Sequence, residues 1–87
     1  MNNYQAADEY ISNHMRTGIL SRRARRSFIK NWLQEMESGY ERDVAVRVAL
    51  KTTRKELGNP LLWFAISWAI ENLLVPLLIR WWENRQK

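Results

Sequence analysis

One long apolar run constrains the fold of this 87-residue chain more than any other feature. Residues 60–79, PLLWFAISWAIENLLVPLLI, contain eleven Leu, Ile, Val and Phe residues and a single acid, Glu71. Twenty residues of helix span about 30 Å, the thickness of a bilayer's hydrocarbon core. On an insertion scale the apolar side chains contribute about −5 kcal/mol, whereas a central acid costs about +3 kcal/mol. The run therefore predicts either a marginal transmembrane helix or the core helix of a small domain.

The flanks of the run favour a membrane. They carry aromatic and basic residues of the kind that lie at membrane–water interfaces, namely Trp63, Arg80, Trp81 and Trp82. Residues 40–59 hold five Lys and Arg residues, and the segment after the run holds three. Because basic flanks tend to stay on the cytoplasmic side, we expect a membrane-associated protein whose N-terminal region is cytoplasmic.

A soluble fold stays open as the alternative. In that fold the run is the last helix of a cytoplasmic four-helix domain and is buried on all sides. Glu71 then pairs with an arginine, and Phe64 and Trp68 are ordinary core residues. The chain outside the run is short for this purpose, because a domain of this size has little apolar area with which to cover a helix completely.

A narrow polar strip crosses the run. At helical spacing Ser67 lies one turn before Glu71, and Asn72 adjoins it. Inside a bilayer such a strip turns away from lipid toward a partner helix. We therefore expect a homo-oligomer that associates through Ser67, Glu71 and Asn72; a structural ion pair or a protonated carboxyl at Glu71 is the simpler alternative. Pro76 is expected to bend the helix because it lacks an amide donor.

The rest of the chain predicts three more helices, over residues 3–16, 22–38 and 40–57. Apolar residues recur at helical spacing in the first two. The third also alternates as a strand would, but its Arg, Lys, Glu and Ala content favours a helix. The predicted fold class is therefore all-α with about four helices, divided into a basic helical region (1–59) and an apolar C-terminal helix (60–87).

Turn residues set the expected boundaries of these helices. Gly18 and Gly39 are expected to end helices, and Ser21 to cap the second one. In the sequence GNP, residues 58–60, the glycine suits a C-cap and the asparagine an N-cap. The proline suits the first position of the last helix.

A basic cluster without acids begins the second predicted helix. Its members are Arg22, Arg23, Arg25, Arg26 and Lys30. On an amphipathic helix these side chains can contact anionic lipid headgroups, and the same spacing can neutralise nucleic-acid phosphates. For any single arginine, a solvated helix face is the simpler interpretation.

Composition argues against catalysis. The chain has no cysteine and one histidine, His14, and it lacks a glycine-rich phosphate loop and metal-ligand spacing. We expect no enzyme, no cofactor and no metal site.

The expected function is a small non-enzymatic membrane-associated protein that self-associates through its C-terminal helix, with membrane permeabilisation or remodelling as the sharper form. Its layout is common among small phage and bacterial membrane-active proteins, an analogy that carries no residues with it. One alternative is a soluble helical module that uses its arginines on nucleic acid or on an acidic protein surface. Another is a structural subunit of a larger assembly, such as a virion, with Trp81 and Trp82 against another protein.

Overall fold

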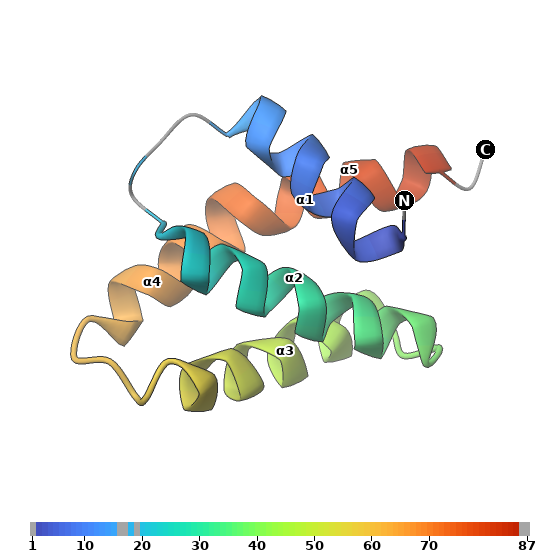
Figure 1. The fold of residues 1–87 in the computed structure, drawn as a ribbon. Helices are drawn as coiled ribbons and strands as arrows, with labels where there is room; N and C mark the ends of the chain where they lie inside the picture. The colour runs from blue at the N-terminus through green and yellow to red at the C-terminus, as the bar shows by residue number, and fades with distance from the viewer. Residues whose placement is uncertain (1, 16–17, 19, 86–87) are drawn as a thin grey trace.

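The computed structural model describes residues 2–15, 18 and 20–85. This part of the protein is all-α, as the sequence predicts. Its four helices are α1 (Asn3–His14), α2 (Arg22–Glu37), α3 (Arg42–Glu56) and a long C-terminal helix, which consists of α4 (Trp63–Ala69), a π-helical segment η1 (Ile70–Leu74) and α5 (Val75–Arg85). Successive helices run in alternating directions (Figure 1). We call the end of the bundle where α2 begins, α3 ends and α4 begins the tip end, and the end where α2 turns into α3 the turn end.

The first two helices begin where their sequences provide caps. Asn2 and Gln5 form a reciprocal capping box at the start of α1, with the Gln5 amide donating to Asn2 Oδ1 at 2.8 Å. Ser21 caps α2 as predicted, because its Oγ accepts from the Ala24 amide at 3.2 Å. The predicted end of the first helix at Arg16 lies outside the described residues, and α1 ends at His14, ahead of Gly18.

The third segment is a helix rather than a strand. Ala45, Ala49 and Thr53 recur at helical spacing and are fully buried, and their small side chains let α3 lie close along α2. Each of these two helices is followed by a glycine in the left-handed region, as the sequence predicts: Gly39 (φ 92°) after α2 and Gly58 (φ 77°) after α3.

The predicted start of the last helix at Pro60 is wrong. Asn59 follows Gly58 in the left-handed region (φ 52°) and donates its amide to the Arg54 carbonyl at 2.9 Å, so it ends α3 instead of capping α4. A turn in which the Trp63 amide donates to the Pro60 carbonyl at 3.1 Å comes next, and the helix begins at Trp63. This late start leaves Leu61 outside the helix.

The turn before Pro76 is π-helical. The Val75 amide donates to the Ile70 carbonyl, five residues back, instead of four. Pro76 has no amide hydrogen for the carbonyl four residues before it, so the regular α-helical ladder is already interrupted there. The Asn72 side chain satisfies another carbonyl of this region by donating to Trp68 O at 2.9 Å.

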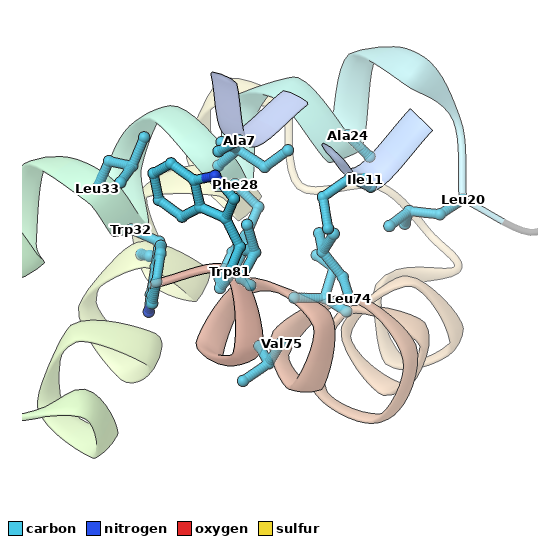
Figure 2. Close-up of a cluster of buried hydrophobic side chains, with 14 of the residues drawn as sticks. Ala7, Ile11, Leu20, Ala24, Phe28, Trp32, Leu33, Leu74, Val75 and Trp81 are labelled. Carbon is cyan, nitrogen blue, oxygen red and sulfur yellow. The ribbon is translucent and has the colours of Figure 1, made fainter. Parts of the chain in front are cut away.

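All four helices contribute to one hydrophobic core. Its largest fully buried side chains include Ile11 from α1, Phe28 and Trp32 from α2, and Leu74 from the C-terminal helix (Figure 2). Only one face of the C-terminal helix enters this core. The expectation that a soluble fold would bury this helix on all sides is therefore wrong, because the three shorter helices cover it from one side only.

Candidate interaction surface

A group of large apolar side chains is exposed at the tip end. The group, here called the apolar tip, comprises Leu61, Leu62, Phe64 and Trp68, whose exposed fractions are 99%, 64%, 73% and 57%. Among the described residues, the one other large hydrophobic side chain in this class is Tyr40, at the turn end. Contiguous exposed apolar residues mark interaction sites, whereas scattered ones are ordinary.

The local backbone explains why the apolar tip is exposed. The left-handed Gly58–Asn59 pair ends α3 and carries the chain past the end of the bundle before α4 begins (Figure 1). Leu61 and Leu62 lie in this connection, beyond the reach of the core. Phe64 and Trp68 follow at a spacing of four residues on the outer face of the C-terminal helix.

Basic side chains lie at the same end of the bundle as the apolar tip. The guanidinium carbon of Arg54 lies 6.0 Å from the centroid of the Trp63 ring, which links the end of α3 to the start of α4. Arg23 Nη2 donates to the Glu56 carbonyl at 3.0 Å, which links the start of α2 to the end of α3. Arg22 and Lys55 are exposed at the same two helix ends. We call these four residues, Arg22, Arg23, Arg54 and Lys55, the cation collar.

The predicted basic cluster of α2 divides into two parts. Arg25 and Arg26 both face Asp8 of α1, with Nε to carboxylate-oxygen distances of 3.5 and 3.4 Å. Lys30 Nζ lies 2.9 Å from Glu56 Oε2 of α3. These three cations join α2 to its neighbours, and only the first two members of the cluster belong to the cation collar.

Glu56 is the acceptor at the centre of a polar joint between α2 and α3. Its carboxylate accepts from the Asn31 amide, from Ser27 Oγ at 2.8 Å and from Lys30 at 2.9 Å. These hydrogen bonds lower the pKa of Glu56 from 4.5 to about 2. The hydrogen bond from Asn31 has the largest effect, followed by those from Lys30 and Ser27. Glu56, which adjoins Lys55 in the sequence, is therefore ionised and already hydrogen-bonded within the fold.

The predicted polar strip lies mostly at the surface. Ser67 Oγ donates to the Phe64 carbonyl at 3.1 Å within its own helix, as Asn72 does to Trp68. Glu71 is exposed, and the ion pairs of the described residues do not include it. It lines a shallow groove with four residues, Asp43, Val46, Arg47 and Val75. Among the described residues, the arginine pairing expected for a soluble fold is thus not made, and association through this strip stays a prediction.

The structure places the predicted membrane-interface residues in different surroundings. Arg80 is exposed and Trp63 is half-buried, whereas Trp81 is a core residue with 9% exposure. Trp82 packs edge-on against Trp32 with ring centroids 5.9 Å apart. While the bundle is closed, Trp81 does not reach a membrane; the interfacial role of the other three stays a prediction.

The far end of α5 is tied to α1 and α2. The Arg85 guanidinium carbon lies 5.3 Å and 5.0 Å from the ring centroids of Trp81 and Trp82. Arg85 Nη2 also donates to Asn3 Oδ1 at 3.0 Å. Trp81, Trp82 and Arg85 therefore help to hold α5 against α1 and α2.

The C-terminal helix is long and apolar enough to cross a membrane. Taken through η1 it runs over 23 residues from Trp63 to Arg85, and 28% of its most apolar window is buried. A core helix of a soluble protein can meet the same length and hydropathy criteria, but such a helix is mostly buried. This helix has one face in the core and another in solvent.

The single histidine of the chain, His14, has a local contact within α1. His14 stacks on Tyr10 with ring centroids 4.0 Å apart, and its Nδ1 lies 2.8 Å from the Tyr10 carbonyl oxygen. Within residues 2–15, 18 and 20–85, His, Asp and Glu side chains form no group that could hold a metal ion.

Sequence reasoning did not single out Leu61, Leu62, Arg54 and Lys55 as site residues. The available signal was the Gly58–Asn59 pair, because two residues that tolerate the left-handed region can carry a chain past a helix end.

Comparison of the sequence with protein-family models, and of the protein with curated proteins and solved structures, finds no match.

Proposed function

We propose that this protein is a non-enzymatic helical protein that attaches to a membrane by inserting its apolar tip. The observation that carries the proposal is the exposure of Leu61, Leu62, Phe64 and Trp68 within eight consecutive residues of the chain. Keeping this much apolar surface in water is unfavourable, and a lipid surface offers a place to bury it.

The size of the apolar tip supports reversible attachment. Complete burial of a Leu or Phe side chain is worth about 1.5–3 kcal/mol, so partial insertion of four side chains supplies several kcal/mol. A single acyl chain of comparable apolar size gives marginal, reversible membrane binding. The protein is thus suited to binding a membrane surface in its folded form.

Charge favours a membrane over a second copy of the chain as the occupant of the apolar tip. The protein carries a net charge of +5, and the cation collar lies at the same end of the bundle as the tip. Two copies that met tip to tip would bring like charges together, whereas an anionic membrane attracts them. Self-association through Ser67, Glu71 and Asn72, which the sequence predicts, is the second candidate, supported by the exposed position of Glu71 and Asn72.

Vesicle flotation tests the proposal with the full-length protein. We expect the wild type to float with phosphatidylcholine vesicles, and the double substitution Phe64→Ser and Trp68→Ser to weaken binding about tenfold or more. Tyr40→Ser removes an exposed aromatic residue at the turn end and should leave binding unchanged.

Size-exclusion chromatography tests the alternative that a second copy of the chain covers the apolar tip. If the wild type forms a dimer without lipid, the same double substitution dissociates it, and vesicles do not compete with it, the apolar tip is a subunit interface and the membrane proposal is wrong. Equal binding of the wild type and the double variant to vesicles would also overturn it.

A further inference from the structure

We infer that the cation collar binds the phosphates of anionic lipid headgroups, and that the charge separation along the bundle holds the protein end-on to the membrane. This inference rests on the proposed membrane attachment and names the lipid class and the orientation. The proposed binding site differs from the basic cluster predicted on α2, because its residues come from both α2 and α3. Neither helix alone contains the whole set.

The tip end is strongly basic because few acids lie near it. Residues 22–34 and 44–70 together contain a single acid, Glu56, and the exposed Glu71 follows one helical turn after Trp68. That carboxylate is already bound by Lys30, Asn31 and Ser27, so it has little capacity left to neutralise the collar. Arg22 and Lys55 show no hydrogen bond or ion pair to the described residues and are exposed, so both are accessible to a ligand.

The collar is positioned by contacts that leave its charge available. Arg23 donates to a backbone carbonyl and Arg54 lies over an aromatic ring, and neither contact cancels a positive charge. A guanidinium has five donors in a planar fork, so Arg23 can keep its carbonyl contact and still bind a phosphate. The collar therefore leaves positive charges at the tip end, which faces the headgroups when the tip enters the bilayer.

The segment that joins α2 to α3 at the turn end carries the opposite charge. Residues 35–43 contain four acids, Glu35, Glu37, Glu41 and Asp43, against one base, Arg42. These residues close α2 and open α3, at the other end of the bundle from the apolar tip (Figure 1). An anionic surface attracts one end and repels the other, so the end-on orientation with the tip inward has the lowest electrostatic energy.

A matched pair of charge substitutions tests the collar. Arg22→Gln with Lys55→Gln removes two charges at the tip end, and Arg42→Gln with Arg47→Gln removes two exposed charges elsewhere. Flotation compares vesicles of phosphatidylcholine with vesicles that also contain phosphatidylglycerol. A basic residue near an anionic surface is worth about 1 kcal/mol, so each lost charge should weaken binding to the anionic vesicles about fivefold.

The expected result is a loss of about 25-fold for the tip-end pair on anionic vesicles, with binding to phosphatidylcholine unchanged. The second pair should have a much smaller effect, because charges beyond about 8–10 Å are screened at physiological salt. Equal losses for the two pairs would show that only net charge matters and would overturn the inference. Unchanged binding by the tip-end pair would overturn it as well.

Failure of the inference and failure of the proposed function are distinguishable. The double substitution Phe64→Ser and Trp68→Ser tests the apolar tip, because it should weaken binding to both vesicle types. The charge substitutions should weaken only the additional binding that phosphatidylglycerol provides. A duplex DNA of random sequence serves as the competing ligand. If the tip-end pair weakens DNA binding while phosphatidylglycerol adds nothing to vesicle binding, the collar binds nucleic acid and the lipid inference is wrong.

Discussion

The two ends of the C-terminal helix look alike in sequence and differ in the fold. Each end carries tryptophans beside an apolar stretch, and each contacts an arginine through an aromatic ring. At the start, Phe64 and Trp68 are exposed, whereas at the other end Trp81 lies in the core. An aromatic and basic flank is thus compatible with both an interface anchor and a packing residue. What separates the two cases is whether another helix covers that face.

The largest expected contrast between the two ends comes from removing one tryptophan from each. Trp81→Ala should lower the free energy of unfolding by about 3–5 kcal/mol, because it leaves a cavity between α5 and its neighbours. Trp68→Ala should change that free energy by less than about 0.5 kcal/mol, because its side chain is 57% exposed. Urea denaturation measures both values, and similar losses would contradict the difference between the ends.

A smaller effect is expected at the connection that exposes the apolar tip. Gly58→Ala should cost about 1 kcal/mol of folding stability, because φ is 77° and a Cβ disfavours that region. The control Gly58→Asn should cost less, since asparagine tolerates the left-handed conformation. Thermal denaturation compares the two variants. If alanine is as well tolerated as asparagine, the connection does not require this conformation.

The polar joint at the tip end should respond to acid, unlike the aromatic packing at the end of α5. The pKa of Glu56 is about 2 in the fold and 4.5 ordinarily, so its ionised form stabilises the fold above about pH 4.5. This contribution is lost as the pH falls through 2. The stability difference between the wild type and Glu56→Gln should therefore shrink from neutral pH to pH 2 in urea titrations. Parallel stability profiles for the two proteins would exclude this role.

The smallest expected effect is at Glu71, near the middle of the C-terminal helix. Glu71→Gln should alter the unfolding free energy of the monomer by less than about 0.5 kcal/mol, because the side chain is exposed and makes no ion pair with the described residues. Sedimentation velocity then tests the predicted self-association. Association that survives the substitution indicates that the charge is not required, whereas loss of association indicates a charge pair with a partner.

Local sequence was sufficient where the determinant was a cap or a helical repeat. The Ser21 cap and the left-handed glycines at 39 and 58 were all predictable, because capping depends on a few adjacent residues. The start of the last helix was not, because Asn59 can serve either as an N-cap or as a left-handed residue. The hydrogen bond from its amide to Arg54 selects the second role.

The candidate site was only partly predictable. The sequence identified Arg22 and Arg23 as contacts for anions, but it grouped them with Arg25, Arg26 and Lys30. In the fold these last three pair with acids that are distant along the chain. Such pairings depend on which helices become neighbours, and charge spacing along one helix carries no information about them.

The sequence by itself determined that this chain is all-helical, basic, and equipped with one helix long and apolar enough to span a bilayer, because these properties follow from composition and local periodicity. Tertiary structure decided which apolar residues are available to a partner. Three short helices bury one face of the C-terminal helix and one of its terminal tryptophan groups. The start of that helix extends past the end of the bundle, so Leu61 and Phe64 remain exposed.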